Sequence, residues 1–309
     1  MGKIALVFSG QGAQAPGMGR DLYEHSAAAR SIFQAADALR PGTSEQCFAG
    51  DEAELRETKN TQPCLFAMEL AAAAALGEAG VRADMTAGFS LGELSALAYA
   101  GCGDFDSLFR LVCRRGELMQ HAAEAQPTAM AAVMKLTDTE VERICARFPH
   151  IYPVNYNCPG QVTVSGLAEE MPALREAVKE AGGRSMPLKV RGAFHSPYLE
   201  EAAGAFRQEI AKYSFRSPEI PLYSDSTGEP YGPDVAETLG AQMCAPVRWE
   251  RIVRSMIAAG ADTFVEAGPG RTLCGLIGKT DSAVRCFAIS ETKDIAALLR
   301  ETEGGYAER

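Results

Sequence analysis

The segment Gly88-Phe89-Ser90-Leu91-Gly92 constrains this chain more than any other part of it. A short apolar run at residues 85–87 precedes it, and a segment of helical composition follows at residues 93–98. A serine with a glycine two positions away on each side is typical of a nucleophile elbow, a sharp turn between a strand and a helix. The turn brings neighbouring side chains so close that only glycine fits beside the serine. We therefore predict that Ser90 presents its hydroxyl at the tip of a strand, beside the positive end of a helix.

The composition is that of a globular protein and excludes several classes of function. A length of 309 residues suits one large domain, or a large domain carrying a small one. The net charge of −10, with no run of lysine and arginine, argues against a nucleic-acid partner. Nine cysteines without a C-x-x-C pair indicate reduced thiols, as in a cytosol.

The apolar stretch at residues 4–8 is too short for a signal peptide. The alanine-rich residues 71–75 fit an amphipathic helix with Glu69 and Glu78 rather than a membrane span. We expect a cytoplasmic protein with no membrane partner, no metal and no cofactor.

Strands and helices alternate over most of the chain. The buried strand expected at residues 4–8 ends in a glycine-rich loop at residues 9–14, and the strand before Ser90 is flanked by helical patterns. This alternation predicts a mainly parallel, hydrolase-like sheet covered by helices on both faces. The other expected elements of this part are helices at residues 18–39, 63–77, 104–124 and 196–213, and strands at 220–223, 263–265 and 286–289.

The middle of the chain has a different pattern. Its elements follow the order βαββαβ, which is the ferredoxin-like arrangement. We expect strands at residues 129–136, 151–156, 162–165 and 185–190, and helices at 138–148 and 169–181. The prediction is an α/β protein with a small ferredoxin-like α+β subdomain at residues 127–190, inserted into a large domain of residues 1–126 and 191–309. The cleft between the two is the expected substrate site.

A serine nucleophile needs a base at neutral pH, and histidine is the usual one. His195 lies in the loop that leaves the small domain and enters the large one, where it overlooks the cleft. The remaining histidines are expected at the surface: His25, His121 and His150. No acidic residue stands out as the partner of His195, so a backbone carbonyl is an alternative. The sequence does not decide between the two.

Two further features concern the binding of a substrate. An oxyanion hole needs two converging donors, and we expect the Leu91 N–H and an N–H of the loop at residues 10–12. Arg115 falls on the apolar stripe of its helix, in line with Leu108, Val112 and Met119. A buried guanidinium must find an anion. That anion is either an internal acid or a carboxylate of the substrate, held in bidentate geometry.

These residues belong to a set of motifs spread over nearly the whole chain. The set comprises Phe8-Ser9-Gly10-Gln11-Gly12, Thr61-Gln62-Pro63, Gly88-Phe89-Ser90-Leu91-Gly92-Glu93, Arg115-Gly116, Asn157-Cys158-Pro159-Gly160-Gln161-Val162, Phe194-His195-Ser196, Gln242, Pro246-Val247-Arg248-Trp249 and Glu266-Ala267-Gly268-Pro269-Gly270. In this order they resemble the malonyl-CoA:acyl-carrier-protein transacylases of fatty-acid synthesis and the acyltransferase domains of polyketide synthases.

The resemblance implies a ping-pong transfer of malonyl from malonyl-CoA to the phosphopantetheine thiol of an acyl carrier protein. It implies Ser90 as the acylated nucleophile, His195 as its base and Arg115 as the clamp on the malonyl carboxylate. The oxyanion hole would be the amides of Gln11 and Leu91, and the backbone carbonyl at Gln242 would orient His195.

This chain departs from the family's pattern at two positions. Phe89 stands where a histidine usually precedes the nucleophile, so we expect altered packing or an altered hydrogen bond beside the substrate. Ala245 stands where an asparagine is common, so we expect a polar contact near the base to be lost. The sequence Ala193-Phe194-His195 is similar to the malonyl-selective form of the loop, in which a bulky phenylalanine disfavours an α-methyl branch.

Other functions remain open at this stage. A serine esterase or thioesterase uses the same elbow with water as the acceptor. Malonyl transfer in polyketide assembly or malonate breakdown uses identical chemistry, and a carrier-docking module with a decayed site would not be an enzyme. The basic residues expected to meet an acidic carrier protein are Lys179, Arg184, Lys189 and Arg191.

Overall fold

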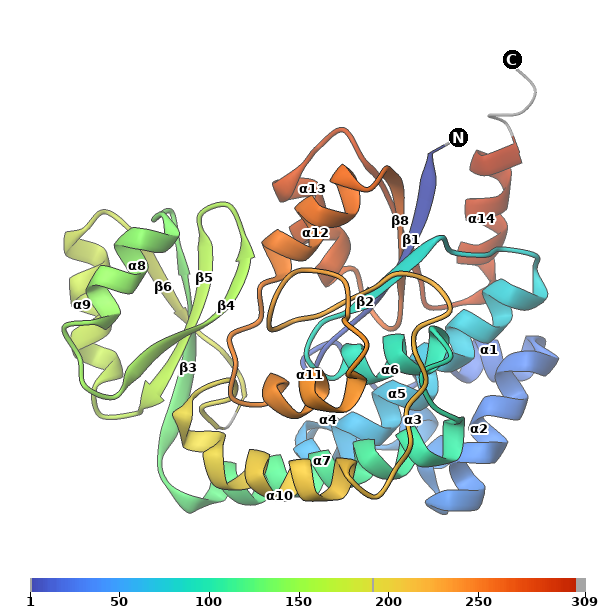
Figure 1. The fold of residues 1–309 in the computed structure, drawn as a ribbon, viewed down its shortest axis with the longest axis horizontal. Coiled ribbons are helices and arrows are strands. Elements are labelled where there is room, and N and C mark those ends of the chain that lie inside the picture. Colours follow the sequence, from blue (N-terminus) through green and yellow to red (C-terminus); the bar gives the residue numbers. More distant parts are fainter. Residues whose placement is uncertain (1, 191, 304–309) are drawn as a thin grey trace.

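A five-stranded parallel sheet forms the centre of the large domain (Figure 1). The computed structural model describes residues 2–190 and 192–303. The strand order is β7-β2-β1-β8-β9, and every neighbouring pair runs parallel, as the sequence predicts. The strands are β1 (Lys3–Phe8), β2 (Met85–Gly88), β7 (Leu222–Tyr223), β8 (Ala261–Ala267) and β9 (Arg285–Ile289).

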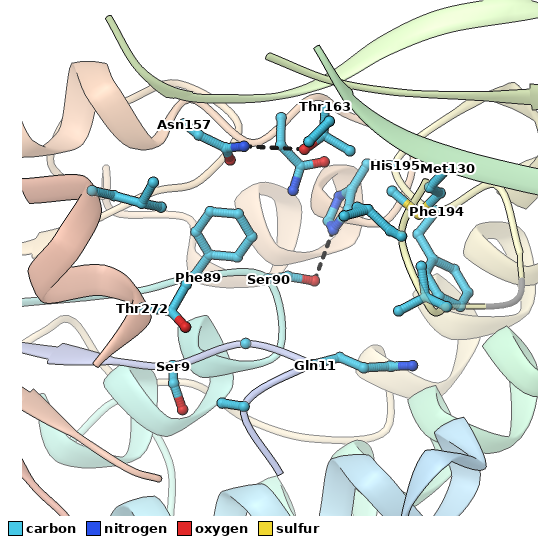
Figure 2. Close-up of a pocket in the computed structure, with 18 of the residues that line it drawn as sticks. Ser9, Gln11, Phe89, Ser90, Met130, Asn157, Thr163, Phe194, His195 and Thr272 are labelled. Carbon is cyan, nitrogen blue, oxygen red and sulfur yellow. Dashed lines mark hydrogen bonds between the residues drawn. The ribbon is translucent and has the colours of Figure 1, made fainter. Parts of the chain in front are cut away.

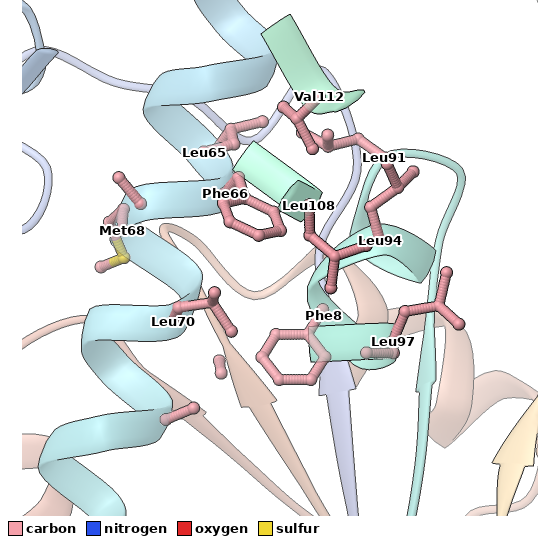
Figure 3. Packing of buried hydrophobic residues seen from close by; sticks show 14 of the residues in the cluster. Phe8, Leu65, Phe66, Met68, Leu70, Leu91, Leu94, Leu97, Leu108 and Val112 are labelled. Carbon is pink, nitrogen blue, oxygen red and sulfur yellow. The ribbon is translucent and has the colours of Figure 1, made fainter. Parts of the chain in front are cut away.

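Helices cover both faces of this sheet because its central strand is apolar on both sides. Successive side chains of a strand point to opposite faces. Leu6 and Phe8 of β1 join the larger hydrophobic cluster, with α5, α6 and α7 (Figure 3). Ala5 and Val7 join a second cluster with α12 and α13. The predicted two-sided cover is confirmed.

The N-terminal helices differ from the prediction. The single helix expected at residues 18–39 is two helices, α1 (Arg20–His25) and α2 (Ala27–Leu39). Ser26 separates them, since its extended backbone and its hydroxyl, which accepts from the Ala29 N–H, cap α2. Two short helices that the sequence analysis missed follow: α3 (Thr43–Ala49) and α4 (Glu52–Arg56).

The helix α5 (Thr58–Glu78) begins five residues earlier than expected and is not amphipathic. It is buried on nearly all sides, because α2, α6, α7 and the sheet surround it. Glu69 is therefore in the interior, where its carboxyl group accepts hydrogen bonds from Ser9 Oγ (2.7 Å) and Ser95 Oγ (2.6 Å). The expectation of a polar face at Glu69 was wrong.

The inserted domain has the predicted ferredoxin-like topology. Its antiparallel sheet has the order β4-β5-β3-β6, and a separate hydrophobic cluster lies under the helices. The elements are β3 (Thr128–Met134), α8 (Asp138–Cys145), β4 (Ile151–Cys158), β5 (Gln161–Leu167), α9 (Met171–Glu180) and β6 (Arg184–Pro187). The exact domain boundaries stay a prediction.

The remaining helices return the chain to the large domain. They are α6 (Gly92–Tyr99), α7 (Phe105–Ala125), the short 3-10 helix η1 (Pro197–Leu199), α10 (Glu200–Ile210), α11 (Val235–Gln242), α12 (Trp249–Ala258), α13 (Thr272–Thr280) and α14 (Thr292–Glu303). In the described part of the chain, none of the helices combines the length and the apolar character that a membrane span requires.

Candidate active site

Ser90 occupies the turn between β2 and α6, as predicted for a nucleophile elbow. Its φ angle is +55°, a left-handed conformation that is rare for a residue with a side chain. A Cβ on Gly88 would come within 1.9 Å of Gly92, and a Cβ on Gly92 would come within 2.3 Å of the Phe8 carbonyl oxygen. Both glycines are therefore sterically required, and the turn directs Ser90 into a cavity.

His195 is in contact with Ser90, although the two are far apart in sequence. The Ser90 Oγ lies 2.7 Å from His195 Nε2 (Figure 2). On the other side of the ring, Nδ1 faces the backbone oxygens of Gln242 at 3.2 Å and Ala245 at 3.1 Å. Since carbonyl oxygens only accept, Nδ1 carries the proton and Nε2 is free to accept from Ser90. The orienting group is thus the backbone, not an acid.

Burial keeps His195 neutral. The side chain is 3% exposed, and burial, together with the nearby Arg115 charge, lowers its pKa to about 4. At neutral pH the ring is unprotonated, which is the form a general base needs. The other histidines are exposed, as expected: His25, His121 and His150.

Arg115 is fully buried on the inward stripe of α7, also as predicted. Its Nη1 donates to Gln62 Oε1 (2.9 Å), and its Nη2 donates to Gln242 Oε1 (2.9 Å) and to Ser90 Oγ (3.2 Å). Burial lowers the pKa of Arg115 to about 10, so the side chain stays charged at pH 7. None of the ion pairs in the described part of the chain involves Arg115. The internal salt bridge that the sequence left open does not form.

The cavity over Ser90 lies between the two domains, where the substrate cleft was expected. Its volume is about 260 Å³. The large domain contributes the loop after β1, the elbow and α13, and the small domain contributes side chains of β3, β4 and β5. The lining residues include Gln11, Met130, Asn155, Thr163, Phe194 and Leu276.

Gln11 and Leu91, the residues expected to form the oxyanion hole, both lie close to Ser90. Gln11 lines the cavity, and its side chain donates to Thr58 Oγ1 at 3.1 Å. Its loop lies close to the elbow, because a Cβ on Gly10 would come within 2.7 Å of the Phe89 carbonyl oxygen. Leu91 is buried directly before α6. That these two amides bind an oxyanion stays a prediction.

The two departures from the family's pattern have different consequences. The ring of Phe89 lines the cavity and packs against Trp249, with centroids 5.6 Å apart, so it presents an apolar surface beside Ser90. At Ala245 the backbone oxygen accepts from His195 Nδ1. An alanine side chain has no polar atom, so the expected loss of a side-chain polar contact near the base stays a prediction, and the backbone oxygen is the group that meets His195.

Three residues of the site were given no role by the sequence analysis. Gln62 and Glu93 belong to quoted motifs, but nothing in the sequence shows that they face the reacting serine. Asp225 carries no sequence signal at all, since it lies in an ordinary loop after β7. Its carboxylate accepts from the Ser90 N–H at 2.5 Å.

The chain is similar in sequence and in fold to known proteins. The model of the acyl transferase domain matches residues 5–297. The chain is 36% identical to a malonyl CoA-acyl carrier protein transacylase of Bacillus subtilis, over 97% of both chains. It superimposes on the transacylase of that name from Clostridium perfringens with a TM-score of 0.95, at 32% identity and covering 99% of this chain and 98% of the other. A malonyl-transacylase solved in complex with a type II polyketide acyl-carrier protein gives a TM-score of 0.93, at 31% identity over 97% and 99% of the two chains.

Proposed function

This chain belongs to the acyl transferase family, and on that premise we propose that it transfers malonyl from malonyl-CoA to the thiol of an acyl carrier protein. The observation that carries the proposal is the environment of one atom. Ser90 Oγ lies 2.7 Å from Nε2 of a neutral histidine and 3.2 Å from Nη2 of a buried guanidinium. That guanidinium forms no ion pair with a carboxylate among the described residues. Malonyl thioesters supply both an electrophilic carbonyl for the hydroxyl and a carboxylate for the guanidinium. We also place the enzyme in the cytoplasm.

The first half-reaction acylates Ser90. His195 Nε2 takes the hydroxyl proton while Oγ attacks the thioester carbonyl carbon, and the oxyanion is held by the amides of Gln11 and Leu91. When the intermediate collapses, the carbon–sulfur bond breaks and the proton on His195 goes to the departing CoA sulfur. In the second half-reaction, His195 accepts the proton of the carrier thiol, the sulfur attacks the malonyl ester, and Ser90 leaves with that proton.

Arg115 links substrate choice to this chemistry. Its charge contributes to the low pKa of His195, second to burial. A malonyl carboxylate on Arg115 offsets that charge, so the imidazolium formed in the transition state becomes less costly. An acetyl group offers no such anion, so Arg115 keeps only neutral hydrogen-bond partners at the site. Malonyl is favoured both in binding and in proton transfer.

Intact-mass analysis tests the proposal. Incubation with malonyl-CoA should add the malonyl increment of about 86 Da, as covalent catalysis requires, and addition of a carrier protein should discharge it. Ser90→Ala should show no adduct, and Ser95→Ala, at a buried serine one turn into α6, is the matched control that keeps it. Absence of an adduct in the native chain would contradict the proposal. Hydrolysis without transfer to the carrier would identify a thioesterase instead.

A further inference from the structure

Three charged side chains are buried together behind Ser90. Glu93 from α6 and Arg115 from α7 are 0% exposed, and Asp225 is 1% exposed. Two acids thus share the interior with a single arginine. If both acids were ionised, the group would carry a net negative charge out of contact with water, which is strongly unfavourable.

Asp225 holds the backbone of the nucleophile. One carboxylate oxygen, Oδ2, accepts from the Ser90 N–H at 2.5 Å and from Gln242 Nε2 at 3.3 Å. The same Gln242 nitrogen donates to the Ser90 carbonyl oxygen at 2.6 Å. Both backbone polar groups of Ser90 are therefore fixed from one side, and this offsets the strain of its positive φ angle.

The Glu93 carboxyl group binds the backbone of Asp225. The Asp225 N–H donates to Glu93 Oε1 at 3.1 Å, and the Tyr231 hydroxyl donates to the same oxygen at 2.7 Å. The second oxygens, Asp225 Oδ1 and Glu93 Oε2, are buried without a hydrogen-bond partner among the described residues. A carboxylate oxygen in such a position costs free energy, whereas a protonated one does not carry the charge.

The other groups around the pair do not change this charge balance. Arg115 from α7 is the nearby cation whose charge lowers the pKa of both acids, and Gln242 from α11 is neutral. Tyr231 stays protonated, because burial and the nearby Glu93 raise its pKa well above the usual value. Burial also raises the pKa of Glu93 to about 7 and that of Asp225 well above its usual value, in part through their mutual repulsion for Asp225.

We propose that Glu93 and Asp225 hold one proton between them, so that the pair is a single anion balanced by Arg115, and that Asp225 is a positioning residue for the nucleophile elbow. The charge state follows from burial and contacts alone. The kinetic consequence rests on the proposed function of Ser90.

Infrared spectroscopy of the resting protein tests the shared proton without reference to activity. A protonated carboxyl group has a C=O stretching band that ionised carboxylates lack and that deuterium shifts. The spectrum of the native chain minus that of Asp225→Asn should contain this acid band at pH 7. In Asp225→Asn, Glu93 is the only acid left in the pair and must be ionised to balance Arg115, so the variant lacks the protonated carboxyl group of the native pair. A difference spectrum showing only loss of an ionised carboxylate would overturn the proposal.

Glu69→Gln is the matched control for this measurement. Glu69 is a second buried acid, and burial raises its pKa to about 8, so it contributes an acid band of its own. The control removes that band and leaves the band of the pair. The two contributions are thereby assigned separately, and an acid band lost only in Glu69→Gln would also overturn the shared proton.

Kinetics test the positioning role. Asparagine keeps an oxygen for the Ser90 N–H, so Asp225→Asn should stay within about 3-fold of the native kcat/KM for malonyl-CoA, whereas Asp225→Ala should lose about 10- to 100-fold, as expected for an orphaned buried donor. The loss should fall on kcat for both malonyl-CoA and acetyl-CoA, because the elbow serves either substrate. Equal activity of the two variants would overturn the positioning role. If the acid band is found but the native chain does not transfer malonyl, the proposed function is refuted while the shared proton stands.

Discussion

Arg115→Ala separates the clamp from every other role of this side chain. In the native chain the guanidinium donates to Gln62, Gln242 and Ser90 Oγ, all of which are neutral groups. A malonyl carboxylate would replace such partners with an anion in bidentate geometry. Alanine removes that interaction for malonyl, while an acetyl group never makes it.

The magnitude follows from the number of hydrogen bonds lost. Each hydrogen bond to a charged group contributes about 1.5–3 kcal/mol. Two of them correspond to about 3–6 kcal/mol, or about 10²- to 10⁴-fold in rate. Removal of Arg115 also leaves the Gln62 and Gln242 side-chain oxygens without their donor. That damage affects both acyl groups equally, so the ratio of the malonyl to the acetyl rate isolates the clamp.

The assay is single-turnover acylation with malonyl-CoA and acetyl-CoA, followed by mass spectrometry. We expect Arg115→Ala to lower the malonyl-to-acetyl ratio by about 10²- to 10⁴-fold, with acetyl acylation kept or increased. Arg114→Ala is the control, since Arg114 is exposed on the same helix and pairs with Glu117 at 3.0 Å. Equal losses for both acyl groups would refute the clamp, whatever the absolute rates.

Three further predictions concern single groups. Because the pKa of His195 is about 4 in the folded protein, kcat/KM for malonyl-CoA should stay level from pH 7 to pH 5 and fall near pH 4. An acid limb centred at the ordinary histidine pKa of about 6.5 would contradict this. The raised pKa of Glu69, about 8, means that the folded state keeps a proton that the unfolded state loses near pH 4.5, so stability falls as pH rises between these values. Glu69→Gln should therefore raise the melting temperature more at pH 8 than at pH 5, and a shift that does not vary with pH would refute the assignment. Finally, Phe194 lines the cavity at 6% exposure, so Phe194→Ala should raise methylmalonyl relative to malonyl transfer by about 10-fold or more. An unchanged preference in a panel of acyl-CoA substrates would exclude its steric role.

Local patterns in the sequence were sufficient for much of this protein. The spacing of the glycines around Ser90 predicts the elbow, because the steric requirement lies within five residues of chain. The position of Arg115 among Leu108, Val112 and Met119 predicts its burial, because helical periodicity is also local. The alternation of strands and helices predicts the parallel sheet and the inserted ferredoxin-like domain, because the pattern of each element is also local in the sequence.

The tertiary structure decided what depends on contacts between distant segments. The burial of Glu69 was not predicted, since the helices that surround α5 come from several parts of the chain. The orientation of His195 by two backbone oxygens has no side-chain signature and therefore leaves no trace in the sequence.

The clearest division is at Ser90 itself. The sequence determined that a serine stands at a strained turn, because the turn is made by its immediate neighbours. Only the fold brings His195 to its hydroxyl, Arg115 beside it, and Asp225 to its backbone N–H from 135 positions further along the chain. Charge and protonation in that interior are set by burial and by distant partners, which no local pattern specifies.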